Sequence, residues 1–120
     1  MAFRELSPAE QEQILRLRQL EQTVQNLRIQ QAEISRTLSE IEMTKKELQK
    51  LDSESKVWKN VGSVMFPKKV SEVLKELAER AELLELKQKS FSSQEAQNTK
   101  RLEELQARLS EQLSNSRPSN

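Results

Sequence analysis

The 120-residue sequence contains no cysteine, no histidine and a single glycine, Gly62. Without cysteine there is no disulfide, thiolate nucleophile or zinc–thiolate site, and without histidine the commonest acid/base group and metal ligand is missing. One glycine cannot build the glycine-rich loops that bind dinucleotides or nucleoside triphosphates. We therefore expect no enzymatic activity, no cofactor and no metal.

The chain also lacks a strong net charge and a long apolar run. Its 20 basic and 19 acidic residues give a net charge of +1, which is too little to hold a phosphate backbone by charge alone. No apolar run approaches the roughly 18 residues of a membrane span, and residues 1–10 lack the apolar region of a secretory signal. We expect no nucleic-acid partner, no membrane partner and a cytoplasmic location.

The abundant residues favour long helices. Ala, Glu, Lys, Leu and Arg make up 62 of the 120 residues, a composition typical of coiled coils. Hydrophobic residues account for only 34% of the chain, below the roughly 45–50% of ordinary globular domains. Leu, Ile, Val and Phe nevertheless supply 30 residues, more than disordered chains carry. The chain should fold around narrow apolar stripes.

The first predicted helix spans residues 8–52. Ser7, Pro8 and Glu10 have the spacing of an N-cap, a first helical residue and the glutamate of a capping box. Residues then recur at alternating spacings of three and four, which is the heptad seam of a coiled coil. The seam consists of Leu17, Leu20, Val24, Leu27, Gln31, Ile34, Leu38, Ile41, Lys45 and Leu48.

The second predicted helix spans residues 71–115, with Ser71 as its N-cap and Pro118 beyond its end. It repeats the same spacing from Leu74 to Gln112. Two helices of similar length joined by a short connection bury both stripes when they fold back on each other. The predicted fold is mainly α: one domain over residues 1–120, a long antiparallel coiled-coil hairpin with a short β-hairpin at the connection.

The register between the helices is predicted from polar mismatches. If facing residues have numbers that sum to 129, Gln31 faces Asn98 and Leu27 faces Leu102. If the sum is 122, Asn98 faces Val24 instead. Because a polar group against an aliphatic one is costly, we predict the first register.

The residue types of the connection, residues 57–66, favour strand over helix. It contains the only Trp, the only Gly and three of the six Val residues. Positive φ at Val61 would be strained in a two-residue turn, so we predict a three-residue loop, Asn60-Val61-Gly62, with Gly62 left-handed.

That loop places apolar side chains on both faces of the hairpin. Trp58, Val64 and Phe66 would share one face, and Val57 and Met65 the other. A lone hairpin is marginally stable, and a ribbon with two apolar faces and free edges aggregates unless it is covered. Hairpins from other subunits would cover it in a sheet or barrel. The predicted assembly residues are Val57, Trp58, Val61, Gly62, Val64, Met65 and Phe66.

Apolar residues also gather near the two chain ends, which antiparallel pairing brings together. Phe3, Leu6, Ile14 and Leu113 are assigned to this region outside the regular seam. They either make local packing contacts or form a surface for apolar segments of other proteins. The sequence leaves both readings open.

This arrangement resembles the β-type subunits of prefoldin, a hexameric co-chaperone. The similarity covers essentially the whole chain, and its specific part is an aromatic residue, Val-Gly and an apolar strand, followed by the start of the second helix. These positions are Trp58, Val61, Gly62, Val64, Met65, Phe66, Val73, Leu74 and Leu77. Within the family, the hairpin is most similar to that of the eukaryotic subunit 1 type. Pro67 should shorten the second strand.

The resemblance implies a function that the residues alone do not give. Prefoldin hairpins of α-type and β-type subunits assemble into barrels, and the coiled-coil tips hold unfolded clients such as nascent actin and tubulin for a cytosolic chaperonin, without nucleotide. Barrel positions carry over to Trp58, Val61, Gly62, Val64 and Phe66. Client-binding positions carry over by location alone to Phe3, Leu6, Ile14, Leu109 and Leu113. The alternative is a structural coiled-coil adaptor or tether whose helices pair in parallel between chains.

Overall fold

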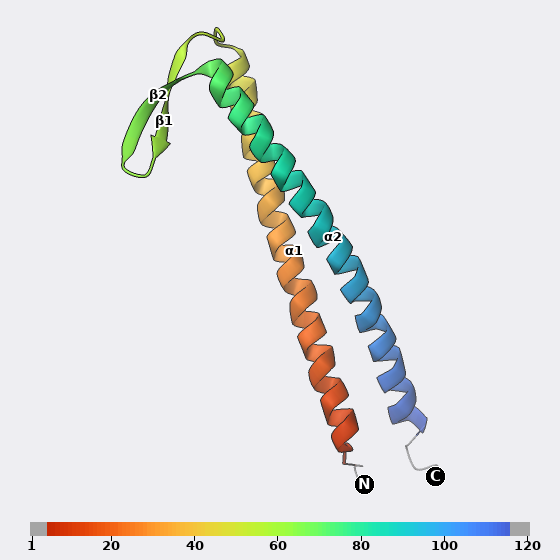
Figure 1. The fold of residues 1–120 in the computed structure, drawn as a ribbon. Helices are drawn as coiled ribbons and strands as arrows, with labels where there is room; N and C mark the ends of the chain where they lie inside the picture. The colour runs from red at the N-terminus through yellow and green to blue at the C-terminus, as the bar shows by residue number, and fades with distance from the viewer. Residues whose placement is uncertain (1–4, 116–120) are drawn as a thin grey trace. The chain divides into compact units, whose positions relative to one another are not determined.

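The computed structural model describes residues 5–115, which form two long helices joined by a β-hairpin (Figure 1). The elements are α1 (Pro8–Gln49), β1 (Lys56–Val61), β2 (Val64–Lys69) and α2 (Val70–Asn115). The two strands form an antiparallel, two-stranded sheet. The predicted fold class is confirmed.

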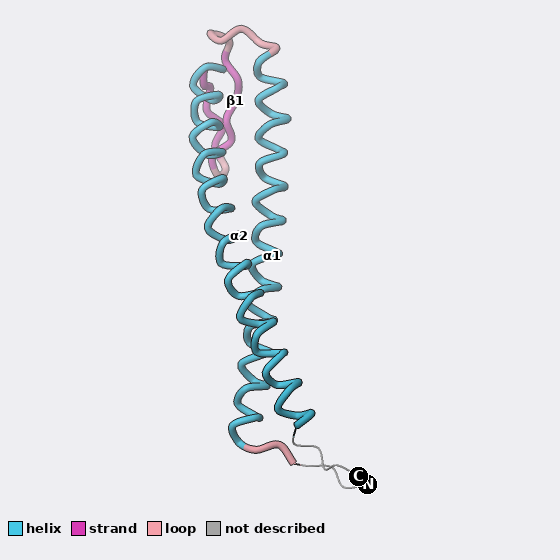
Figure 2. Tube along the Cα trace, turned by 90° about the vertical axis from the view of Figure 1, so that its right-hand side faces the viewer, coloured by secondary structure: helices cyan, strands magenta, loops and turns pink. Residues whose placement is uncertain are grey.

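The chain divides into two compact units, each built from parts of both helices. Unit 1 combines Met1–Gln30 with Phe91–Asn120, and unit 2 is Gln31–Ser90. Within each unit the α1 and α2 segments run side by side in opposite directions (Figures 1 and 2), so the helices pair within one chain. The buried core is a row of aliphatic seam residues together with the first residue of α2: Val24, Leu27, Leu105 and Leu109 in unit 1, and Ile34, Ile41, Leu48 and Val70 in unit 2.

The start of α1 is fixed by the predicted capping box. The Ser7 backbone N–H donates to Glu10 Oε1 at 3.0 Å, and the Glu10 N–H donates to Ser7 Oγ at 3.1 Å. Each side chain thereby satisfies a backbone donor that the first helical turn leaves unpaired. Local sequence alone determines where this helix begins.

The end of α1 comes at Gln49, three residues before the predicted end at residue 52. The N–H groups of Lys50 and Leu51 donate to carbonyls three residues back, at 3.3 and 3.0 Å. Asp52 Oδ1 then accepts a hydrogen bond from the Glu54 N–H at 3.1 Å. A tightened last turn followed by a turn-forming aspartate terminates the helix.

The predicted register between the helices is wrong. In unit 1, Arg28 Nε donates to Glu95 Oε1 at 3.1 Å, and in unit 2, Gln88 Nε2 donates to Ser35 Oγ at 2.8 Å. Both pairs have residue numbers that sum to 123, next to the rejected register and far from 129. The polar groups avoid the expected penalty because they find partners: Glu95 binds Arg28, and Asn98 Nδ2 donates to the Gln94 carbonyl at 2.7 Å.

β2 continues into α2 without a loop, and backbone carbonyls cap the start of α2. The Val70 N–H donates to the Ser55 carbonyl at 2.8 Å, and the Ser71 N–H donates to the Ser53 carbonyl at 3.1 Å. Because α2 begins at Val70, its N-cap position is Lys69, and the prediction of Ser71 as the N-cap is wrong by two residues. Because Val70 is only 1% exposed, this junction anchors both ends of the hairpin in unit 2.

The turn of the hairpin has two residues, not the predicted three. Val61 pairs with Val64, which leaves Gly62 and Ser63 as the turn. Gly62 has φ +60°, and no other described residue has positive φ. Positive φ at the first central position alone is the geometry of a type II′ turn, which favours glycine there. The left-handed Gly62 is confirmed. Val61 lies in β1, outside the turn, so the strain at Val61 that we expected of a two-residue turn does not arise.

The two-residue turn changes which side chains share a face. Trp58 pairs with Pro67 and lies on one face with Met65, whereas Phe66 lies on the other face. The predicted grouping of Trp58 with Val64 and Phe66, and of Val57 with Met65, is wrong, because a pairing shift by an odd number of residues exchanges the faces. Pro67 does not shorten β2, since each strand of a two-stranded sheet has a free edge that tolerates proline.

Candidate functional site

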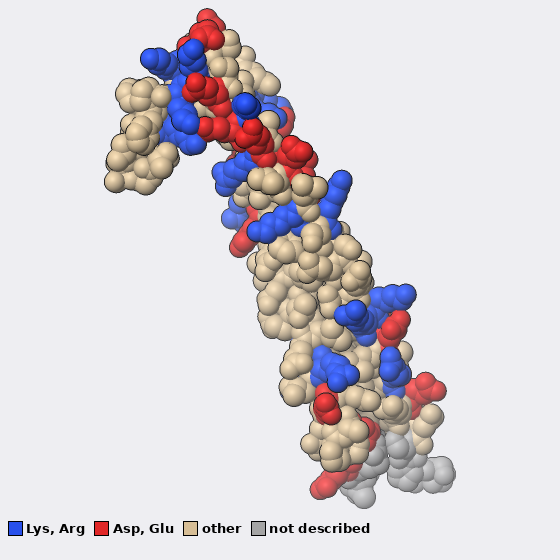
Figure 3. Space-filling model, in the orientation of Figure 1, with Lys and Arg blue, Asp and Glu red and all other residues tan. Residues whose placement is uncertain are grey.

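The residues predicted to drive assembly lie on the hairpin, and most of their side chains are exposed. Five large side chains are about half exposed or more: Trp58 66%, Val61 53%, Val64 50%, Met65 58% and Phe66 48%. Gly62 lies in the turn, and Val57 is half-buried. The view in Figure 3 shows the turn end of the hairpin free of charged side chains. All seven predicted assembly residues thus lie on one small ribbon.

Opposite faces of this ribbon carry different parts of the set. Trp58 and Met65 lie on one face, which we call the outer face. Val57, Val61, Val64 and Phe66 lie on the other, which we call the inner face because its lysines contact α2. Because both faces remain apolar near the turn, a partner that covers only one would leave the other in water.

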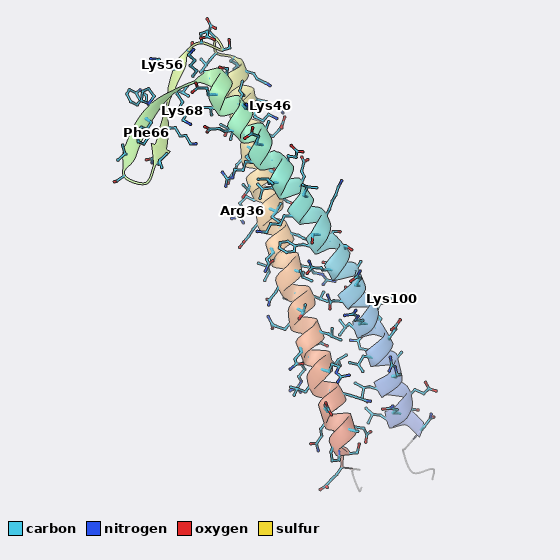
Figure 4. All side chains as sticks on the ribbon, in the orientation of Figure 1. Arg36, Lys46, Lys56, Phe66, Lys68 and Lys100 are labelled. Carbon is cyan, nitrogen blue, oxygen red and sulfur yellow. The ribbon has the colours of Figure 1, made fainter. Side chains whose placement is uncertain are left out.

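A carboxylate on α2 holds the base of the hairpin. Lys59 Nζ donates to Glu76 Oε2 at 2.6 Å, and Lys68 Nζ donates to Glu76 Oε1. Figure 4 labels Lys68 on the side of the hairpin toward α2. We call these three residues the Glu76 clasp. It binds both strands to one position of α2, so it sets the orientation of the inner face.

The clasp also shifts the ionisation of its members. Hydrogen bonds from Lys59 and then Lys68 lower the pKa of Glu76 from 4.5 to about 2, against a smaller opposing effect of burial. The hydrogen bond with Glu76 raises the pKa of Lys68. At the other end of the hairpin base, Lys69 Nζ lies 3.0 Å from Glu54 Oε2, and this contact raises the pKa of Lys69.

Sequence reasoning missed the clasp. With the two-residue turn, the alternation of side chains along each strand places Lys59 and Lys68 on the same face of the hairpin, so this part of the clasp could have been predicted. The choice of Glu76 as their partner depends on how the hairpin lies against α2, which no local pattern encodes.

Four of the five predicted client-binding residues are described, all in unit 1, and the structure exposes them unequally. Phe3 lies outside the described residues. Leu6, Ile14 and Leu113 are half-buried. Leu109 is only 5% exposed, because it occupies a seam position that packs between the helices. The expectation that Leu109 offers open apolar surface is therefore wrong, and it supports the helix pair from inside.

Leu15 is an exposed apolar residue of unit 1 that sequence reasoning did not single out. Its exposed fraction is 56%. The signal was available, because Leu15 falls two residues before the seam residue Leu17 and cannot share its face. It adds to the half-buried Leu6 and Ile14 on the first part of the chain.

Within residues 5–115, no group of three or more acidic side chains is placed to hold a metal ion. No helix in that range is long and apolar enough to cross a membrane.

Comparison with known proteins gives consistent matches. The prefoldin subunit family model matches residues 11–116. The prefoldin subunit beta of Archaeoglobus fulgidus is 36% identical over 110 residues, which cover 92% of this chain and 95% of that protein. The prefoldin subunit beta of Pyrobaculum islandicum is 32% identical over 110 residues, covering 92% and 88%. The crystal structure of the prefoldin beta subunit from Thermococcus strain KS-1 has a TM-score of 0.81 at 25% identity, covering 98% of this chain and 100% of that one.

Fold and site together define an α-helical hairpin subunit whose connection is a β-hairpin with uncovered apolar faces. The chain belongs to the prefoldin subunit family. Prefoldin subunits are non-enzymatic chaperone components that form hetero-oligomers with other prefoldin subunits. The matched relatives are named prefoldin subunit beta, and the eukaryotic subunit 1 type stays a prediction.

Proposed function

We propose that this chain is one subunit of a hexameric, ATP-independent co-chaperone. It captures unfolded proteins such as nascent actin and tubulin and delivers them to a cytosolic chaperonin. The observation that carries the proposal is the hairpin, whose two faces expose large apolar side chains at the connection of a helix pair. Family membership supports the chaperone role.

Assembly through the hairpin follows from the cost of leaving it uncovered. A two-stranded hairpin is marginally stable in water, and its free edges favour pairing with other strands. Hairpins of α-type and β-type prefoldin subunits have the same need, so mutual pairing removes edges and covers both faces. The Glu76 clasp supports this role because it holds the ribbon in a fixed orientation on α2.

In this proposal the apolar residues of unit 1 bind the unfolded client. Leu15 is exposed, and Leu6, Ile14 and Leu113 retain partial exposure. One such surface binds an unfolded segment weakly. Several surfaces in one complex bind far more strongly, because each contact raises the effective concentration of the next. Phe3 is proposed as a further member of this surface.

Nucleotide has no part in this cycle. The absence of a glycine-rich phosphate loop supports the proposal, and release occurs by transfer of the client to the chaperonin. The proposed location is cytoplasmic, where nascent actin and tubulin are found, with no nucleic-acid or membrane partner.

The test is light scattering of denatured actin diluted into buffer without ATP, in the presence of the reconstituted complex. Leu15→Ser should reduce protection from aggregation, because it removes exposed apolar surface from unit 1. Leu86→Ser is the matched control, since Leu86 is 58% exposed against 56% for Leu15 but lies on α2 in unit 2. Equal loss of protection in both variants, or none in either, would contradict the proposed client surface.

A further inference from the structure

The two free edges of the hairpin differ in the hydrogen bonds that they can offer. Among the described residues the sheet contains only β1 and β2, so each strand has one edge without a neighbouring strand. An added strand must bind the backbone groups that point away from the hairpin. Which groups these are follows from the register.

Pro67 fixes the direction of the backbone groups. It pairs with Trp58, and proline has no N–H to donate across the hairpin. Antiparallel pairs alternate between those that exchange two hydrogen bonds and those whose groups point outward. The Trp58–Pro67 pair is therefore an outward-pointing pair, and so are its neighbours two residues away, Asn60–Met65 and Lys56–Lys69. The pair that flanks the turn, Val61–Val64, belongs to the class that exchanges two hydrogen bonds, as a two-residue turn requires.

The outward N–H groups form a complete row on one edge only. On β1 they belong to Lys56, Trp58 and Asn60, with no gap. On β2 they belong to Met65 and Lys69, and Pro67 interrupts the row between them. A strand laid along β2 would leave its own central carbonyl without a donor, which is costly once water is excluded.

We propose that the β1 edge receives a full-length strand from the hairpin of another prefoldin subunit, whereas the β2 edge pairs with a neighbour only near the turn. This inference rests on the proposed assembly through the hairpin and adds which edge of the hairpin forms the full-length strand pairing. Trp58 supports it, because the most exposed aromatic side chain of the hairpin stands at the centre of the β1 edge. A strand that pairs there covers part of the indole as it forms its hydrogen bonds.

Lys56 and Lys69 provide a matched pair of test positions. They lie directly opposite each other, carry the same side chain and point their N–H groups to opposite edges. Lys56→Pro and Lys69→Pro each delete one outward N–H. Lys56→Ala and Lys69→Ala remove the same side chains and keep the N–H, so they correct for lost charge, including the Lys69–Glu54 ion pair.

The experiment measures the affinity of the full chain for the other prefoldin subunits by titration. Lys56→Pro should bind at least about tenfold more weakly than Lys56→Ala, because an unmade backbone hydrogen bond is left at a dry edge. Lys69→Pro should bind within about twofold of Lys69→Ala. Circular dichroism and Trp58 fluorescence of the free variants establish that helices and hairpin are intact. If Lys56→Pro perturbs the hairpin, an amide-to-ester exchange at position 56 removes the same donor alone.

Equal losses in the two proline variants, no loss in either, or a larger loss for Lys69→Pro would overturn the edge assignment while leaving hairpin assembly in place. Failure of the unaltered chain to bind any prefoldin subunit would instead refute the proposed function. Pro67→Ala, which restores the missing donor, should leave the affinity unchanged.

Discussion

Replacement of Trp58 by alanine should dissociate the chain from its complex without unfolding it. In the free chain Trp58 is 66% exposed, so its loss removes little packing, and exposed substitutions typically change stability by less than about 0.5 kcal/mol. In the assembly the same side chain would be covered by a neighbouring hairpin. The effect should therefore fall on association and not on folding.

The size of the effect follows from the area that becomes covered. A buried Trp covers up to about 250 Å², and with 66% of Trp58 exposed in the free chain, roughly 150 Å² is left for the partner to cover. At about 25 cal/mol per Å² this surface contributes about 4 kcal/mol, of which alanine would retain about a quarter. The remaining loss of about 3 kcal/mol corresponds to a dissociation constant raised by roughly a hundredfold.

The assay is size-exclusion chromatography of the variant mixed with the other prefoldin subunits, with helicity followed by circular dichroism. Met43→Ala is the matched control, because Met43 is 68% exposed but lies on α1 outside the hairpin. The reasoning is refuted if Trp58→Ala co-elutes with its partners as the unaltered chain does, or if Met43→Ala is equally damaging.

Three further predictions concern the free chain. The pKa of Glu76 is lowered from 4.5 to about 2, so the clasp stabilises the hairpin fully above pH about 4.5 and loses this contribution as the pH falls toward 2. An acid titration followed by Trp58 fluorescence should show this change, and the Glu76→Gln variant should not show it. Ser7→Ala should lower the free energy of unfolding by about 1 kcal/mol through loss of the capping box, measured by urea denaturation, and an unchanged midpoint would contradict the assigned cap. Amides of residues 88–98 should exchange with deuterium faster than those of 74–84, because Gln88, Glu95 and Asn98 interrupt the apolar seam; equal protection would count against this.

Local features of the fold were predictable because neighbouring residues determine them. The Ser7–Glu10 capping box involves residues three apart, and the structure contains both of its hydrogen bonds. The heptad spacing likewise determines which side of each helix is buried. The register was not predictable by the same means. It depends on whether polar side chains such as Glu95 find partners on the other helix, and the Arg28–Glu95 pair becomes known only when both helices are placed.

The hairpin shows how a small error propagates. Gly62 was correctly assigned as left-handed, but the predicted loop began at Asn60, two residues before the observed turn at Gly62 and Ser63. Because side chains alternate along a strand, that choice exchanged the faces of Trp58 and Phe66 relative to each other. A Gly-Ser pair is itself a signal for a two-residue turn, so the correct register was available from the sequence.

The candidate site was predictable as a set of residues and not as an arrangement. Composition alone singled out the residues of the hairpin, since a Trp and several Val residues stand out in a helix-forming chain. The Glu76 clasp was beyond reach because it joins β1, β2 and α2 across up to 17 positions. At the chain ends, apolar character did not separate buried Leu109 from exposed Leu15; only their positions relative to the seam did.

Native mass spectrometry of the complex that co-purifies with the full chain tests the central claim most directly. Assembly through hairpins of several prefoldin subunits predicts a complex of six subunits that contains this chain together with α-type and β-type partners. The same complex should be missing when Trp58 is replaced by alanine. A homodimer of this chain, or a monomer with no prefoldin partner, would contradict the account.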